Sequence, residues 1–96
     1  MRLNRRRKSY RDLCKDLAKG SSLVIELANA TFEQFCKDPA HTSLRLHKLE
    51  ARPRLPRYVC WSVSISMRYR AIYFVDGDVN VWFWIGSHED YNNLIA

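Results

Sequence analysis

The sequence predicts an α+β fold, an N-terminal helical hairpin packed on an antiparallel sheet of three or four strands. Three observations predict it. Apolar residues recur every three or four positions between Tyr10 and Cys36, as on the buried faces of helices. Apolar and polar residues then alternate through most of residues 59–85, as in half-buried strands. The links between the segments are short, which favours helices lying on one face of an antiparallel sheet.

Composition places the chain among small globular proteins. Its 96 residues suffice for one domain, so we expect residues 1–96 to form a single domain, with residues 1–8 as a basic arm or a short first strand. The hydrophobic fraction of 47% and the charged fraction of 27% are typical of soluble domains. No apolar run approaches the roughly 20 residues that span a bilayer, and no apolar segment follows the basic N-terminus. We therefore expect a cytoplasmic protein without a membrane partner.

The charge of the chain is uneven. The formal net charge is +6, which favours a polyanion or an acidic protein as partner. One basic cluster lies at residues 2–8 and a second at residues 45–57, whereas no Lys or Arg follows Asp76. Three scattered cysteines, without a CxxC pair, are expected to be buried free thiols in a reducing compartment: Cys14, Cys36 and Cys60.

The two helices have recognisable ends. Ser9 is expected to cap the first helix, and Gly20 to end it. One of the serines at 21–22 caps the second helix. That helix ends at Asp38, because the residue before Pro39 is pushed out of the helical region.

Four segments are expected to form strands. A short strand begins near Ser43, and the clearest one covers residues 59–66, where serines occupy one polar face. Residues 69–75 and 79–85 form the last two, joined by a tight turn in which Gly77 supplies a positive φ. In the final strand, the aliphatic residues and Phe83 are expected to face the helices, and the tryptophans to face the other way.

Four stretches together resemble the RelE/ParE toxin superfamily. They are residues 42–49 (TSLRLHKL), 61–65 (WSVSI), 69–73 (YRAIY) and 84–91 (WIGSHEDY). With the helical hairpin ahead of them, the resemblance covers roughly residues 9–93.

The resemblance implies the toxin of a type II toxin–antitoxin pair. RelE-like members cleave messenger RNA, usually on the ribosome, without metal or cofactor, and ParE-like members poison DNA gyrase. An antitoxin segment wraps around either kind. We expect an endoribonuclease that inhibits translation, with mRNA on the ribosome and an acidic or amphipathic antitoxin segment as partners. The alternatives are a gyrase poison without catalysis and an inactive relative that binds RNA or antitoxin.

Metal-free RNA cleavage needs a base, an acid and positive charge at the phosphate. His88 is the proton-transfer candidate, because imidazole titrates near neutrality and the residue lies just past a strand, in a tail or short helical turn. Tyr91 is a second catalytic candidate, which stacks on a base or orients the phosphate, or else closes the end of the sheet. The resemblance assigns Arg70, in the Tyr-Arg motif, to the phosphate. Its alternative is an ion pair with an acidic residue at 89–90.

The second basic cluster supplies further candidates. Lys48 is the catalytic lysine that the resemblance implies for this region, and His47 is an alternative base. The expected RNA-binding residues are Arg45, His47, Arg52, Arg54 and Arg57. The alternative for this cluster is a solvated edge that attracts polyanions without chemistry.

Trp82 and Trp84 are expected to bind the antitoxin. Stacking on RNA bases and a small core under the C-terminal segment are the alternatives. No metal site is expected, because the three histidines are far apart in sequence and form no HxH pair.

Overall fold

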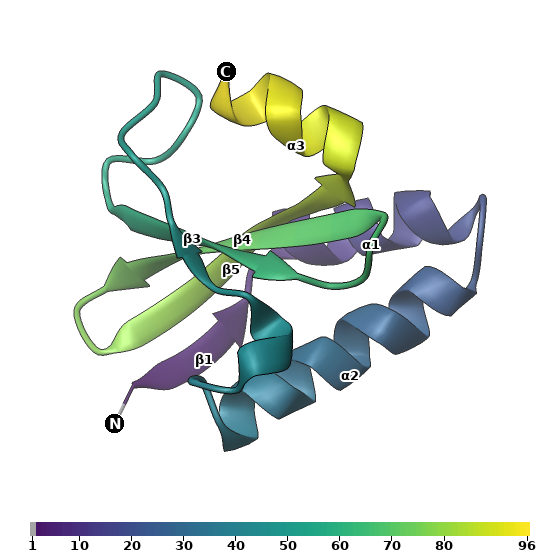
Figure 1. Cartoon of the computed structure of the whole chain (residues 1–96), viewed down its shortest axis with the longest axis horizontal. Helices are drawn as coiled ribbons and strands as arrows, with labels where there is room; N and C mark the ends of the chain where they lie inside the picture. The colour runs from purple at the N-terminus through teal and green to yellow at the C-terminus, as the bar shows by residue number, and fades with distance from the viewer. Residues whose placement is uncertain (1) are drawn as a thin grey trace.

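The computed structural model describes residues 2–96, and a five-stranded sheet lies at its centre (Figure 1). The strand order is β1-β5-β4-β3-β2, with β1 parallel to β5 and all other neighbours antiparallel. The strands are β1 (Leu3–Arg6), β2 (His47–Lys48), β3 (Val59–Ser64), β4 (Tyr69–Asp76) and β5 (Val79–Ser87). The helices are α1 (Lys8–Ala18), α2 (Leu23–Lys37) and α3 (His88–Ile95), with a 3-10 turn η1 (Thr42–Leu44). Across residues 2–96, every helix is too short or too polar to cross a membrane.

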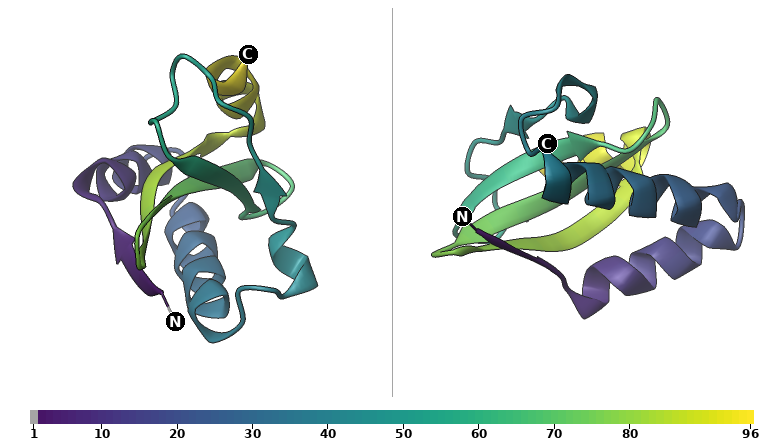
Figure 2. Two further views of the ribbon diagram at one scale, coloured as in Figure 1. Left: turned by 90° about the vertical axis from the view of Figure 1, so that its left-hand side faces the viewer. Right: turned by 90° about the horizontal axis from the view of Figure 1, so that it is seen from below.

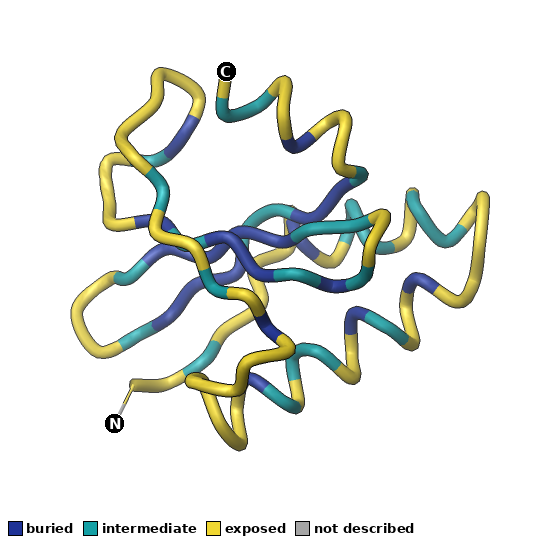
Figure 3. Tube along the Cα trace, viewed as in Figure 1, coloured by how far each residue is buried: buried dark blue, intermediate teal, exposed yellow. Residues whose placement is uncertain are grey.

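Elements cover both faces of the sheet (Figures 1 and 2). Helices α1 and α2 lie against one face, where Tyr10, Phe35 and Trp82 belong to the larger core. Helix α3 and the loop at residues 49–58 cover the other face, where Leu55 and Tyr91 join a second core. Figure 3 shows the buried positions concentrated in β3, β4 and β5, between these two layers.

The α+β class and the helical hairpin on the sheet are confirmed, but the predicted number of strands, their purely antiparallel pairing and the N-terminal position of the hairpin are wrong. The sheet has five strands and is mixed, and the hairpin is not N-terminal because β1 precedes it. The sequence of β1, Leu-Asn-Arg-Arg, has no apolar alternation. Its place at the sheet edge depends on backbone pairing with β5 and on contacts such as Asn80 Nδ2 donating to Asn4 Oδ1 at 3.1 Å.

The strand expected from Ser43 is mostly a different structure. Residues 42–44 form η1, capped by the His41 imidazole, whose Nδ1 accepts from the Ser43 amide at 3.1 Å. Leu44 is buried beneath this turn, and Arg45 follows with a positive φ of 45°. The strand β2 is then only His47–Lys48, and the Leu49 amide that follows also donates to the Cys60 carbonyl of β3 at 2.9 Å.

The predicted orientation of the β5 side chains is wrong for Trp82, and also for Val79, Val81 and Phe83, which belong to the second core and not to the α1/α2 face. The pairing of β4 with β5 shifts between Ile72 and Tyr73, which leaves Phe83 as an extra residue in β5. Such a bulge breaks the alternation of faces along the strand, so Trp82 and Trp84 point to opposite faces of the sheet. Trp82 is on the α1/α2 face, completely buried against the rings of Tyr10, Phe32, Phe35 and Tyr73.

Two other burial predictions need correction. Ser62, expected on an outward polar face, is fully buried, because the Arg70 side chain lies against it. All three cysteines are free, but Cys36 is exposed at the last turn of α2, Cys14 is half-buried and only Cys60 is buried. The predicted turn between β4 and β5 is confirmed, with Gly77 at a φ of 57°.

Candidate functional site

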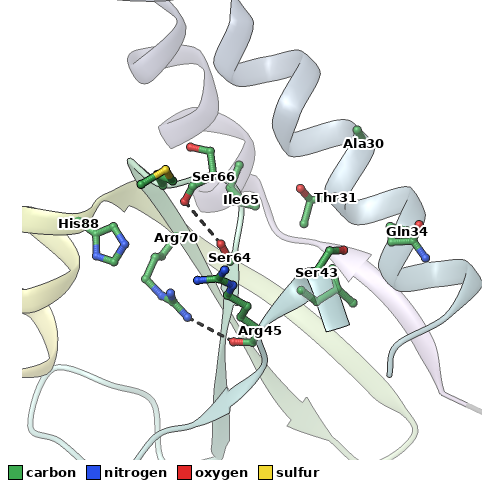
Figure 4. Close-up of a pocket in the computed structure, with 12 residues that line it drawn as sticks. Ala30, Thr31, Gln34, Ser43, Arg45, Ser64, Ile65, Ser66, Arg70 and His88 are labelled. Atoms are coloured by element: carbon green, nitrogen blue, oxygen red, sulfur yellow. Dashed lines mark hydrogen bonds between the residues drawn. The ribbon is translucent and has the colours of Figure 1, made fainter. Parts of the chain in front are cut away.

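A groove of about 680 Å³ opens at the β3 side of the sheet (Figure 4). One wall comes from α2 and η1, and the other from the turn between β3 and β4 together with the start of α3. Polar side chains line both walls. They are Thr31, Gln34, Ser43, Arg45, Ser64, Ser66, Arg70 and His88.

Arg70 is held by its surroundings on β4. Its Nη2 donates to Ser62 Oγ at 2.7 Å and to the Arg45 carbonyl at 3.5 Å. Its Cζ lies 5.2 Å from the centre of the Tyr91 ring, a cation–π contact. The Nε atom is buried without a hydrogen-bond partner. A guanidinium fixed on one edge, with donor capacity left over, is suited to binding a phosphate.

Gly86 lies opposite Arg70 in the sheet and in close contact with Trp84. Gly86 pairs with Arg70 across the sheet, and a Cβ placed on it would come within 2.5 Å of the Trp84 indole. The glycine therefore leaves room for Trp84, whose ring centre is 6.3 Å from that of Tyr91.

His88 is the first residue of α3, at the mouth of the groove. Its backbone amide donates to the Arg68 carbonyl at 3.0 Å, which ties the helix start to the turn between β3 and β4. Ser87 caps the helix, because its Oγ accepts from the Asp90 amide at 3.1 Å. The imidazole is exposed and lies edge-on to Tyr91, with 6.3 Å between ring centres.

Tyr91 lies in contact with both Arg70 and His88. It is only 6% exposed and contacts both the Arg70 guanidinium and the His88 ring. Burial leaves little of the ring free for stacking on a base. The geometry therefore favours a positioning role for Tyr91 over direct contact with RNA.

The basic residues near β2 separate into two groups. Arg45 lines the groove, and His47 pairs with Ser62, which places it on the same sheet face as Arg70. Lys48 pairs instead with Trp61, a residue of the core under α1 and α2. Successive residues of a strand point to opposite faces, so the structure does not bring Lys48 together with Arg70 and His88.

The remaining predicted RNA-binding arginines lie outside the groove. Arg52 is within 3.6 Å of Glu50, and Arg54 Nη1 donates to the Asn93 carbonyl at 3.1 Å, which ties the loop to α3. Arg57 is exposed in the same loop.

The acidic residues of the chain form neither an ion pair with Arg70 nor a metal site in the part that the structure describes. Among residues 2–96, none of the ion pairs involves Arg70, so the expected alternative of a pair with residues 89–90 is wrong. The described part of the chain also holds no group of three His, Cys, Asp or Glu side chains arranged to bind a metal.

Sequence reasoning missed the α2 wall of the groove and the anchor under Arg70. Thr31 and Gln34 lie in the groove on a helix whose pattern indicated only packing. Ser62 belongs to a series of alternating serines that predicted a solvent-exposed strand face. Its contact with Arg70 becomes visible only from the register of β3 with β4.

Comparisons with known proteins agree with this architecture. The profile of the ParE-like toxin domain matches residues 22–93. A copper-bound mutant toxin from Helicobacter pylori superposes with a TM-score of 0.68, at 18% identity over 94% of this chain and 98% of that one. YafQ from E. coli strain BL21(DE3) gives a TM-score of 0.70, at 11% identity over 95% and 98%. The solution structure of HP0894 from Helicobacter pylori gives 0.65, at 19% identity over 93% and 97%.

No curated protein matches the chain. The structural likenesses are below 25% identity and establish the fold alone. The profile match covers most of the sequence, and the fold is that of RelE-like toxins. The chain therefore belongs to the ParE-like toxin domain family, within the RelE/ParE superfamily.

Proposed function

We propose that this toxin domain is a metal-independent endoribonuclease that cleaves mRNA and thereby inhibits translation. The observation that carries the proposal is the groove in which Arg70, anchored by Ser62, lies beside an exposed His88. A pure protein-binding surface has no need of a proton-transfer group next to a fixed guanidinium. The proposed partners are an mRNA on the ribosome and an antitoxin, which the family implies.

The proposed reaction is an attack of the ribose 2′-oxygen on the adjacent phosphorus. A base takes the 2′-hydroxyl proton, the bond from phosphorus to the 5′-oxygen breaks, and an acid protonates that oxygen. The products are a 2′,3′-cyclic phosphate and a 5′-hydroxyl. His88, which lines the groove, is the proposed acid. His47, which lies outside the groove lining but on the same sheet face as Arg70, is the proposed base. Arg70 and Arg45 stabilise the charge on the phosphate oxygens.

The opposite wall suits a nucleobase. Gln34 and Ser43 face the groove from α2 and η1, across from His88 (Figure 4). An amide side chain both donates and accepts hydrogen bonds, as the edges of the bases require. The phosphate is therefore proposed to lie against β4, and a neighbouring base against α2.

The antitoxin surface must differ from the one predicted. Trp82 has no exposed surface, so it cannot contact a partner in this fold. Trp84 is half-buried between Gly86 and Tyr91 and remains a candidate contact.

The test is cleavage of a defined mRNA by the purified protein, with and without translating ribosomes. Arg70→Lys keeps the charge but loses the fork-shaped donor set, and we expect at least about a hundredfold loss of rate, as for other groups that bind transition-state charge. The matched control is Arg11→Lys, at an exposed position of α1. Full activity of Arg70→Lys would rule out Arg70 as the phosphate ligand.

A second candidate function is inhibition of DNA gyrase, which membership of the ParE-like toxin domain family favours. A poison of that kind would arrest growth while leaving mRNA intact, and the arrest would persist in His88→Ala. Supercoiling by purified gyrase in the presence of the protein measures this directly.

A further inference from the structure

The strand β1 divides the N-terminal basic cluster between the two faces of the sheet. Arg6 lies on the α1/α2 face, where its Nη1 donates to Asn29 Oδ1 at 3.1 Å and its Cζ lies 4.5 Å from the centre of the Phe32 ring. Lys8 pairs with Asp12 at 2.7 Å. These two basic groups therefore have partners within the fold.

Arg5 and Arg7 lie on the opposite face. Arg5 pairs with Val81, a residue of the second core, and Arg7 is two positions further along the chain. The Cζ of Arg7 lies 6.0 Å from the centre of the Phe74 ring. The register of β1 places Arg5 on the face that α3 partly covers, and the contact with Phe74 places the Arg7 guanidinium, just after the strand, on that same face.

Aromatic rings continue from Arg7 across the sheet. The Phe74 ring lies 5.5 Å from Phe83 on one side and stacks with Tyr58 on the other, at 4.5 Å and an interplanar angle of 21°. Phe74 is 6% exposed, whereas Tyr58 is 49% exposed. The row thus has a buried centre, an open tyrosine at one end and arginines at the other.

Neither arginine of this row is neutralised. Among residues 2–96, no acidic group lies within 4.0 Å of Arg5 or Arg7, and both side chains are exposed. The acidic residues of this end of the sheet are Asp76 and Asp78, at the turn between β4 and β5, beside the start of β1. That turn lies beyond Leu3 in β1 and beyond Val75, which pairs with Val59 next to Tyr58, so the acidic charge is toward the tyrosine end of the row.

We propose that Arg5, Arg7 and Tyr58 form a second RNA-binding surface, which holds a single-stranded segment of RNA outside the groove. The proposal rests on the proposed function for its biological meaning. Guanidinium groups contact phosphates, and an exposed tyrosine stacks on any base. The surface begins at β1, one edge of the sheet, whereas the groove lies toward the β2 edge, so one RNA strand can contact both.

The observations favour RNA over a helical protein partner. A helix docks through a continuous apolar groove, but Phe74 is already covered by Tyr58 and Arg7. What the surface offers is separated positive charges and one aromatic face, the combination that single-stranded nucleic acid requires.

The test is binding of a fluorescent 2′-O-methyl oligoribonucleotide of 12 nucleotides, which lacks the reacting hydroxyl, to the full chain. Fluorescence anisotropy over a range of salt concentrations gives the slope of log affinity against log salt. Arg5→Gln with Arg7→Gln should reduce the steepness of that slope by about 1.4, or about 0.7 for each lost phosphate contact. The control, Lys15→Gln with Lys37→Gln, removes the same charge from exposed positions of α1 and α2 and should leave the slope unchanged.

Tyr58 supplies an independent readout. Tyr58→Ala should weaken binding by about 5- to 150-fold, the range for loss of one base stacked on an aromatic ring, while Tyr58→Phe should bind as the wild type does. Circular dichroism of each variant checks that the fold is retained. If the Arg5/Arg7 variant and the lysine control lose equal affinity, or Tyr58→Ala binds normally, the surface does not exist.

Failure of this surface can be told apart from failure of the proposed function. A wild-type protein that binds the oligonucleotide through these residues but never cleaves mRNA would overturn the endoribonuclease and keep the surface. Normal cleavage of mRNA with unchanged binding by the Arg5/Arg7 variant would overturn the surface and keep the endoribonuclease.

Discussion

At the scale of single residues, the backbone of Arg45 carries strain beside the groove. Arg45 is the only non-glycine with positive φ in the described chain, at 45°, and its carbonyl accepts from Arg70. A side chain in this left-handed conformation costs about 1–2 kcal/mol. Strain of this kind is often retained where function requires a particular side chain.

Arg45→Gly should separate stability from activity. Glycine adopts this φ freely, so the free energy of unfolding should stay the same or rise by up to about 1 kcal/mol. The rate of RNA cleavage should fall, because a groove-lining guanidinium is lost. Urea titration and a cleavage assay on the same preparation measure the two quantities, and a clear loss of stability would show that the arginine side chain holds η1 in place.

Gly86→Ala should destabilise the fold by about 1–3 kcal/mol, the usual cost of inserting an atom into a filled space. The new Cβ would come within 2.5 Å of the Trp84 indole, which must then move. Gly20→Ala is the matched control, because its Cβ would meet only the Leu17 carbonyl at an ordinary 3.7 Å. Thermal unfolding of both variants compares them, and equal melting temperatures would show that Trp84 shifts without cost.

At the scale of elements, α3 both closes the second core and carries His88. Tyr91 packs among residues of β4 and β5, and Leu94 and Ile95 contact the same core. Removing the chain from Ser87 onward would therefore uncover this face of the sheet, so it is not a clean test of catalysis. A change at the helix cap is more selective.

Ser87→Ala should cost about 1 kcal/mol, because the Asp90 amide loses the hydroxyl that accepts its hydrogen bond. The first turn of α3 should then fray, and cleavage should fall further than global stability does, since His88 lies in that turn. Ser87→Thr keeps a capping hydroxyl and should restore both. Unchanged hydrogen exchange at Asp90 in Ser87→Ala would contradict this role.

Local patterns predicted some elements well and others badly. The helical periodicities and the Gly77 turn were sufficient because they depend on contacts close in sequence. The parallel pairing of β1 could not be read from Leu-Asn-Arg-Arg, because its partner lies more than 70 residues away in β5. The bulge at Phe83 has no local signature either, and it places Trp82 and Trp84 on opposite faces of the sheet.

At the scale of the whole molecule, the same limits apply to the candidate site. The family resemblance pointed to Arg70 and the chemistry of imidazole pointed to His88, and the fold places both in one groove. The register of β2 against β3 determines where the neighbouring basic residues lie. It places His47 with Arg70 and Lys48 on the other face, a difference of one position that residue type cannot reveal.

Packing of the larger core makes global stability sensitive to alkaline pH. Burial raises the pKa of Tyr73 from 10.0 to about 12, an effect partly offset by the positive charge of Arg2. Unfolded Tyr73 ionises near pH 10 while the folded residue stays neutral, so stability present below pH 10 is lost as the pH rises to about 12.

Tyr73→Phe should therefore flatten the fall in the free energy of unfolding between pH 10 and pH 12. Tyr58→Phe, at a largely exposed ring, is the comparison for removal of a phenol. Urea titrations at several pH values give the slopes, and identical slopes for the wild type and Tyr73→Phe would mean that another group controls alkaline unfolding.

The most direct test of the endoribonuclease proposal is induced expression in a bacterial host, followed by growth and by mapping of mRNA 5′ ends by primer extension. The proposed site predicts growth arrest with new mRNA ends for the wild-type chain, and neither arrest nor new ends for His88→Ala and Arg70→Lys. Growth arrest without new mRNA ends, or new ends that persist in both variants, would contradict it.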